Sequence, residues 1–229
     1  MKFSEDELVR ISTCGVMPQT ERSMLSQAAE ATFRWGLLER FTGAVPKSQD
    51  IRNRFTVVWN KLWGSRSKEV ALYWTGPRFC VQFGYRFYRF LLTYECMRPF
   101  EPYALDFPSG TITGSTAIVS HKKYRTQEIT AYVLDLTERS PAKHRPALTD
   151  PRALSRWLAI RDMYDSPALG IVHFPLLSGE SWKDESVDEP LAKSWVSAIL
   201  EQAAKTLVYP RPGTHCRKCS MPCEKVIHG

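Results

Sequence analysis

Long apolar runs are missing from this sequence, and their absence limits where we expect the protein to work. The longest hydrophobic stretches are broken by arginine or lysine every few residues, whereas a transmembrane helix needs about 20 consecutive apolar residues. The first residues also do not resemble a signal peptide. We therefore expect a cytoplasmic protein with no membrane partner, in which the cysteines stay reduced and form no disulfides.

The composition also argues against a disordered chain. Of the 229 residues, 43% are hydrophobic and 12% are aromatic, which is enough for the core of one large domain or of a domain with a large insertion. Lysine and arginine total 31 against 24 acidic residues, so the net charge is +7. This charge favours an anionic partner such as nucleic acid, although it also fits ordinary solubility.

Helical periodicity dominates the first hundred residues. The spacing of apolar residues predicts helices over residues 21–41, 48–62 and 76–97. In the first helix the predicted buried face consists of Met24, Ala28, Ala31, Trp35 and Leu38.

Arginines alternate with aromatic residues in the third predicted helix. Arg78, Arg86 and Arg89 lie among phenylalanines and tyrosines, a pattern that can stack bases and neutralise phosphates. The same pattern fits a core helix whose arginines extend to water. Cys80 and Cys96, in the same segment, are expected to be small buried hydrophobic residues rather than ligands.

Strand-like alternation follows from residue 103. We predict strands over residues 103–107, 111–120 and 128–136, and their short connections predict an antiparallel meander. The remaining elements are a helix capped by Thr149 or Asp150, a strand, an acidic surface loop and a last helix, over residues 151–164, 169–174, 178–189 and 190–207. The predicted buried face of the last helix is Leu191, Trp195, Ile199 and Leu200.

The last residues concentrate cysteine in a tight pattern. Cys216, Cys219 and Cys223 form C-x2-C-x3-C after a Pro-x-Pro-Gly turn, and such closely spaced thiolates can bind one metal centre from a single turn. Three ligands leave a zinc ion or a four-iron cluster one ligand short. The candidates for the fourth are Cys14, Cys80, Cys96, His215 and His228, and we favour Cys14 because it lies in a turn-like Cys-Gly-Val-Met-Pro segment. Three free thiols are the alternative.

The order of elements and the Pro-Gly-x-His-Cys-x-x-Cys segment together resemble the PD-(D/E)XK nuclease superfamily. In particular, the chain resembles the iron-sulfur nuclease domains of RecB and AddB type and the CRISPR adaptation exonucleases. The resemblance implies an α/β (α+β) fold with a restriction-endonuclease-like core, in which a mainly antiparallel or mixed sheet is flanked by helices. It also implies a four-iron, four-sulfur cluster held by Cys14, Cys216, Cys219 and Cys223. The last cysteine interval is tighter than is usual in the family, which leaves zinc as an alternative.

The catalytic motif of that family is incomplete in this sequence. The family binds a divalent metal through an Asp on the second strand and an Asp or Glu on the third, followed two residues later by a Lys. The matching positions here are Ala117, Asp135 and Thr137, so Asp135 remains alone. Glu128 and Glu138 flank the third strand and are the candidates that could substitute.

Three regions and three functions follow as expectations. Residues 1–100 form a helical region that contributes one cluster ligand, residues 101–207 a PD-(D/E)XK-like core, and residues 208–229 a metal-binding tail. The first function is a nuclease-like protein without cleavage that serves as a DNA-binding or structural subunit of a larger assembly, of phage or mobile-element origin, which could also place it in a virion. The alternatives are an active metal-dependent DNA exonuclease and a zinc-stabilised protein-interaction module.

Overall fold

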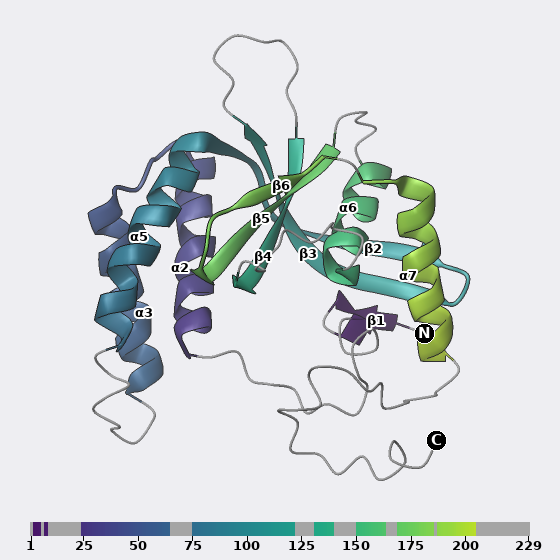
Figure 1. Ribbon diagram of the computed structural model, residues 1–229, viewed down its shortest axis with the longest axis horizontal. Coiled ribbons are helices and arrows are strands. Elements are labelled where there is room, and N and C mark those ends of the chain that lie inside the picture. The colour runs from purple at the N-terminus through teal and green to yellow at the C-terminus, as the bar shows by residue number, and fades with distance from the viewer. Residues whose placement is uncertain are drawn as a thin grey trace.

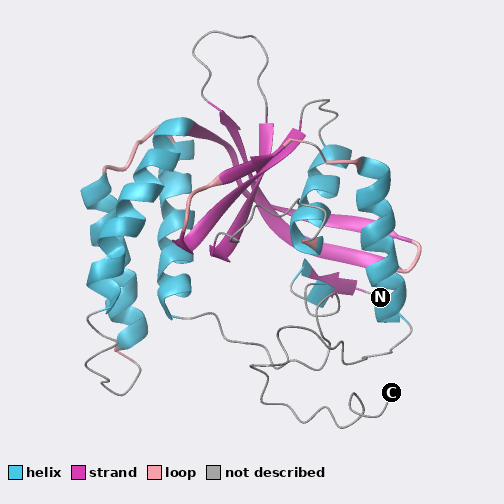
Figure 2. Ribbon diagram, viewed as in Figure 1, coloured by secondary structure: helices cyan, strands magenta, loops and turns pink. Residues whose placement is uncertain are grey.

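A mixed sheet of six strands lies between two layers of helices in the computed structural model (Figures 1 and 2). The structure describes residues 2–5, 7–8, 24–64, 75–121, 131–139, 150–163, 169–185 and 187–204, without the side chains of residues 138, 139 and 202. This α/β architecture, with a mixed sheet flanked by helices, confirms the predicted fold class. The cysteine tail, residues 208–229, lies outside the described residues.

The first helical layer contains α2 (Met24–Phe41), α3 (Ser48–Trp63) and α5 (Thr75–Thr93). Helix α3 begins where predicted, and the carboxylate of Asp50 accepts a hydrogen bond from the Lys47 backbone N–H at 2.9 Å, which satisfies a free donor at the helix start. Phenylalanines of α5 stack against α2 and α3, with the rings of Phe33 and Phe87 at 4.2 Å. The aromatic face predicted for α5 is therefore the core of this layer.

The predicted buried face of α2 is right at Ala28 but is shifted by about one residue toward the end of the helix. Leu38 is 49% exposed, whereas Phe33 and Leu37 are buried. Phe33 sets the rotation of the helix because its ring packs on Phe87 and also on Phe174 of the sheet, at 4.6 Å. The small residues Ala29 and Gly36 then face inward, where the helix approaches its neighbours closely.

Three strands form the predicted antiparallel meander: β2 (Tyr94–Phe107), β3 (Gly110–His121) and β4 (Ala131–Arg139). The helix predicted to reach residue 97 is too long, because α5 ends at Thr93 and β2 begins at once. Tyr94 and Cys96 pair with His121 and Val119 of β3, so long-range strand pairing overrides the local helical period.

A crossover through α6 (Pro151–Met163) joins β4 to the parallel strand β5 (Leu169–Ser178). The carboxylate of Asp150 accepts hydrogen bonds from the backbone N–H groups of Arg152 and Ala153, which confirms it as the helix cap. The segment predicted as an acidic loop contains a short strand, β6 (Trp182–Asp184), because this stretch pairs antiparallel with β5.

The last helix, α7 (Glu189–Ala204), packs beside α6 (Figure 1). Ile199 and Leu200 are buried as predicted, but Leu191 is 52% and Trp195 41% exposed. The buried face instead begins at Ala192 and Val196, and these smaller side chains suit a helix that packs against a neighbouring helix.

The N-terminal residues add a strand that the sequence pattern did not reveal. Strand β1 (Lys2–Ser4) pairs parallel with β3 at residues 111–113. Strands β1 and β4 therefore share one edge of β3, because β4 pairs only with residues 118–120. This pairing brings the residue after β1, Glu5, into the interior of the protein.

The sheet separates two hydrophobic clusters. One lies between the sheet and α2, α3 and α5, and the other lies between the sheet and α6 and α7. Among the helices in the described ranges, none has the length and the apolar character that crossing a membrane requires.

Close contact between α2 and α5 depends on Gly36. A Cβ at this position would collide with the ring of Phe87, which stacks on Phe33 and cannot move freely. We expect Gly36→Ala to lower the free energy of unfolding by about 1–3 kcal/mol, as overpacking does in a dense core. Gly64→Ala is the control, because its Cβ would meet only ordinary contacts. Urea unfolding measures both, and equal stability of the two variants would contradict the close packing.

Candidate functional site

Asp135 lies in the middle of β4 and is completely buried, with 0% of its surface exposed. Side chains alternate along a strand, so Val133 and Asp135 face α6, whereas Leu134 and Leu136 face the other helical layer. A carboxylate at such a depth requires partners of opposite charge.

Two arginines, one helical turn apart on α6, supply this charge. Arg156 Nη1 donates to Asp135 Oδ1 at 3.1 Å, and Arg152 Nε lies 3.5 Å from the same oxygen. Arg152 also donates from Nη2 to the backbone carbonyl of Leu136 at 3.2 Å. The i, i+4 spacing places both guanidinium groups against the same stretch of β4.

Glu5 brings a second carboxylate to Arg156 from the other end of the chain. Its Oε2 accepts from Arg156 Nε at 2.8 Å and from Nη2 at 2.5 Å, and its Oε1 accepts from the backbone N–H of Ser115 at 3.0 Å. Its carboxyl group occupies the space above Gly114, where a Cβ would collide with it. The absence of a side chain at Gly114 therefore makes room for Glu5 on β3.

His173, on β5, completes the surroundings of Asp135. Its Nδ1 lies 3.1 Å from Asp135 Oδ2, and because the ionised carboxylate can only accept, Nδ1 carries the proton. The indole of Trp182 stacks on the imidazole at 4.6 Å. Within the part of the chain that the structure describes, His173 Nε2 has no hydrogen-bond partner.

Electrostatics keep this cluster ionised. Burial by itself raises the pKa of Asp135, but the charge of Arg152, the hydrogen bond from His173 and the charge of Arg156 outweigh burial, so the pKa lies well below its ordinary value. Burial likewise opposes the charge of Arg156, but Glu5 and Asp135 raise its pKa above the ordinary value. Burial and repulsion by Asp135 raise the pKa of Asp150, the cap of α6.

The second-strand position matched to the nuclease motif does not face this cluster. Ala117 lies in the hydrophobic cluster on the opposite side of the sheet from Asp135. Thr116 is the adjacent buried residue, and its hydroxyl donates to the carbonyl of Leu134 at 3.2 Å. The second carboxylate near Asp135 thus comes from Glu5 and not from β3. Glu128 and the side chain of Glu138 lie outside the described residues.

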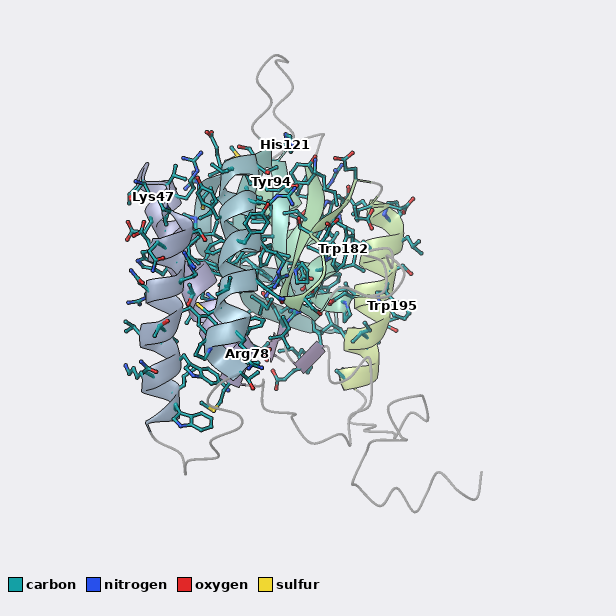
Figure 3. All side chains as sticks on the ribbon, turned by 60° about the vertical axis from the view of Figure 1, so that its left-hand side comes forward. Lys47, Arg78, Tyr94, His121, Trp182 and Trp195 are labelled. Atoms are coloured by element: carbon teal, nitrogen blue, oxygen red, sulfur yellow. The ribbon has the colours of Figure 1, made fainter. Side chains whose placement is uncertain are left out.

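The three arginines proposed for nucleic acid do not form one surface. Arg86 donates to three backbone carbonyls near the end of β5, and burial lowers its pKa. Arg78 is exposed near the start of α5, at the opposite end of the helix from Tyr94 (Figure 3). Arg89 lines a pocket between α5 and the turn that joins β5 to β6.

The four predicted cluster ligands, Cys14, Cys216, Cys219 and Cys223, lie outside the described residues. Cys80 and Cys96 are buried, as expected, although Cys96 belongs to β2 rather than to a helix. Burial raises the pKa of both thiols, that of Cys96 to about 11. No group of three or more potential metal ligands occurs in the described ranges.

Sequence reasoning identified Asp135 but missed most of its partners. Such reasoning could have used two signals: a lone histidine in the apolar strand β5, and two arginines four residues apart on α6. Glu5 gave no signal, since it lies in a segment without periodicity and reaches Arg156 across 151 positions of sequence.

Comparisons with known proteins add no family. Neither a protein-family model nor a curated protein sequence matches this chain.

The cluster predicts a pH-dependent stability. The folded-state pKa of Asp135 is below its ordinary value of 3.8, so its contribution is complete above about pH 5 and is lost as the pH falls through the folded-state pKa. We expect Asp135→Asn to lower the free energy of unfolding at pH 7 by about 3–5 kcal/mol, because the charges of Arg152 and Arg156 stay buried. Urea unfolding between pH 7 and pH 2 measures this difference.

The difference from the wild type should shrink at the acid end of this range. Asp106→Asn is the control, since Asp106 is exposed on β2 and its replacement should change stability by less than about 0.5 kcal/mol. A difference between wild type and Asp135→Asn that is constant with pH would contradict an ionised, stabilising Asp135.

Proposed function

We propose that this protein is a nuclease-like iron-sulfur protein that does not cleave nucleic acid and that serves as a DNA-binding or structural subunit of a larger assembly, of phage or mobile-element origin. One observation carries the loss of cleavage: the guanidinium of Arg156 lies between the carboxylates of Glu5 and Asp135. In a metal-dependent nuclease, two such carboxylates would be needed to bind the divalent ion.

A divalent ion does not fit this arrangement. Both oxygens of Asp135 already have partners, Oδ1 in Arg152 and Arg156 and Oδ2 in His173. Magnesium requires several oxygen ligands and keeps part of its water shell, which a completely buried carboxylate beside two guanidinium groups does not provide. Thr137 also stands where the nuclease family has its lysine.

The active exonuclease remains the second candidate because two carboxylates do approach one another. Glu5 supplies the partner that the sequence motif lacks, and it does so from outside the expected strand. Cleavage would require Arg156 to move away from both carboxylates so that a hydrated metal ion could take its place. This movement would break buried, charge-assisted hydrogen bonds. This cost favours the inactive protein.

The iron-sulfur part of the proposal concerns Cys14 and the three tail cysteines. Two of the other candidates for fourth ligand are poorly suited, since Cys80 and Cys96 lie in the core and burial raises the pKa of their thiols. A metal-binding thiol must lose its proton, so these two residues favour the neutral form. Zinc on the same cysteines, in a protein-interaction module, is the alternative.

A nuclease assay tests the loss of cleavage. We expect no degradation of single- or double-stranded DNA with magnesium or manganese, because neither ion can displace the paired guanidinium group. Asp135→Ala and the surface variant Asp106→Ala are assayed in parallel. Cleavage by the wild type and by Asp106→Ala that Asp135→Ala abolishes would show that the protein is an active exonuclease.

Elemental analysis of protein purified without oxygen tests the cluster. We expect brown protein with about four iron atoms per chain, and loss of most of the iron in Cys14→Ser and Cys219→Ser. Cys96→Ala should keep its iron, since Cys96 is buried in the core. Colourless protein with about one zinc ion per chain would support the interaction module instead.

A further inference from the structure

A second row of apolar side chains on α5 stays open to solvent. Val81, Tyr85, Tyr88 and Leu92 recur at steps of four, three and four residues, so they lie in one row along the helix. Val81, Tyr85 and Leu92 are 53%, 58% and 52% exposed, and Tyr88 is partly buried. The row borders the core face of α5, because each member directly follows a buried residue in the sequence.

This row makes α5 apolar over much more than the face that it needs for the core. A helix at the surface of a domain normally has one apolar stripe and polar residues opposite to it. From Val81 to Leu92 the row covers three helical turns, or about 16 Å. Scattered exposed apolar residues are common, whereas a continuous row of this kind is typical of a surface that another protein covers.

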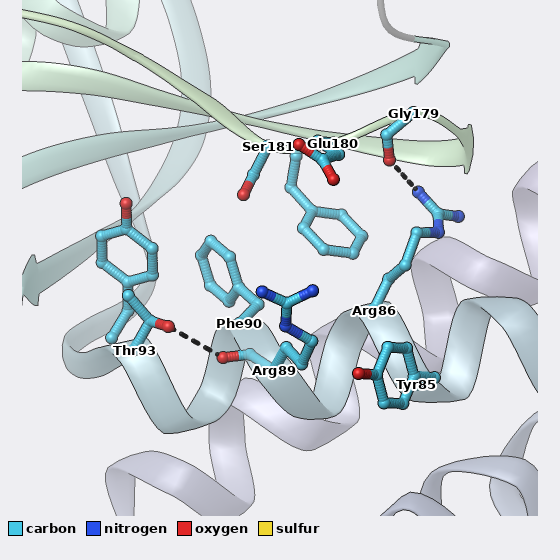
Figure 4. A pocket seen from close by; sticks show the side chains of 10 residues that line it. Tyr85, Arg86, Arg89, Phe90, Thr93, Gly179, Glu180 and Ser181 are labelled. Atoms are coloured by element: carbon cyan, nitrogen blue, oxygen red, sulfur yellow. Dashed lines mark hydrogen bonds between the residues drawn. The ribbon is translucent and has the colours of Figure 1, made fainter.

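The charges along the row are all positive. Arg78 and Arg89 lie on the same side of the row, three helical turns apart, and α5 contains no aspartate or glutamate. Arg89 extends over the ring of Tyr85, with its guanidinium carbon 5.8 Å from the ring centroid (Figure 4). Among the described residues, no carboxylate forms an ion pair with either arginine. These two charges therefore favour an acidic partner.

A pocket of about 390 Å³ lies on the same side of the row, between α5 and the turn that joins β5 to β6 (Figure 4). Arg86 keeps this turn in place, since its guanidinium donates three hydrogen bonds to backbone carbonyls of the turn and of the end of β5. Tyr85 and Arg89 form one side of the pocket, and Glu180 and Ser181 form the other. A helix that lies on the row would pass the mouth of this pocket, where a polar side chain can find hydrogen-bond partners.

We propose that this row docks one amphipathic helix of another subunit, with acidic residues on the side that faces Arg78 and Arg89. The steps of four, three and four residues match the apolar row that a partner helix presents at the same spacing. The distance between the two arginines along α5 predicts acidic residues about three turns apart on that helix.

Three other occupants match the row less well. A symmetric antiparallel pair of α5 helices from two copies would place the arginines of both copies on one side, with no acidic residue to balance them. A nucleic acid would use the arginines but would leave Val81 and Leu92 exposed. A membrane surface requires a broad apolar face, whereas this one is a single row beside two charged residues.

This inference rests on the assembly part of the proposed function, and labelled helical peptides test it. The probe is a peptide of about 18 residues, held helical by a hydrocarbon staple, with one row of four leucines bordered by glutamates. One control peptide replaces the glutamates by lysines, and the other replaces the leucines by glutamines. We expect fluorescence anisotropy to show that the probe binds the full chain roughly tenfold more tightly than either control peptide.

Variants of exposed residues then locate the binding surface. The double variant Val81→Ser, Leu92→Ser should weaken binding of the probe roughly tenfold, because two apolar contacts are lost. Val57→Ser is the matched control, since Val57 is 60% exposed on α3 and lies outside the row, and it should change affinity less than about twofold.

A second pair of variants tests the charge. Arg89→Gln should weaken binding of the probe roughly threefold at low salt, because its attraction to the glutamates is lost. Arg54→Gln is the matched control, since Arg54 is an exposed arginine of α3 and its loss changes the net charge equally. Circular dichroism checks the fold of every variant.

Several results would overturn the inference. These are no binding of the probe by the wild type, equal affinity for the basic peptide, and equal effects of the double variant and Val57→Ser or of Arg89→Gln and Arg54→Gln. A wild-type dimer that the double variant dissociates would instead assign the row to a second copy. Binding of oligothymidine or of anionic vesicles that the double variant abolishes would assign it to a nucleic acid or a membrane.

Failure of this docking surface is distinct from failure of the proposed function. The nuclease assay and the iron analysis concern Asp135 and the cysteines, and neither measurement involves the row on α5. Peptide binding as expected in a protein that also cleaves DNA would therefore keep the docking surface and reject the loss of cleavage.

Discussion

The buried ion pair between Arg156 and Asp135 is the constraint on which the rest of this structure depends. A carboxylate with no exposed surface is stable only if positive charge lies beside it, and the guanidinium of Arg156 is stable there only because Glu5 accepts its remaining hydrogen bonds. These contacts join β4, α6 and the N-terminal segment. Three features bring these charged groups together: the position of β1 along β3, the absence of a side chain at Gly114 and the orientation of α6.

Two sides of the same sheet have different chemical characters. The side that faces α6 contains the charge cluster, in which Asp135 and Glu5 both have partners of opposite charge, whereas the buried His173 Nε2 has no hydrogen-bond partner among the described residues. The other side contains an aromatic pocket whose frame is rigid but whose Arg89 has no hydrogen-bonded acceptor among the described residues. Paired buried charges are typical of structural clusters, so the contacts among Asp135, Glu5 and Arg156 support a structural role for that side of the sheet.

Local patterns predicted the order of the elements well, because periods of 3.6 and 2 reflect which faces are buried. They failed where distant residues decide the outcome. Helix α5 ends at Thr93 because Tyr94 pairs with β3, and α2 turns Leu38 outward because Phe33 packs on two other elements. The candidate site likewise combines a residue that the sequence reveals with contacts that it does not. Asp135 was predicted from the family resemblance, but Glu5 contacts Arg156 in a way that no local spacing encodes.

The sharing of one guanidinium by two carboxylates also restricts how this protein can evolve. A change of Arg156 alone to a neutral residue would leave two negative groups facing each other in a dry interior, and a change of either carboxylate alone would leave an arginine short of its counter-charge. Every path of single substitutions that removes this cluster passes through such an intermediate. Residues 5, 135 and 156 should therefore change slowly and together during evolution.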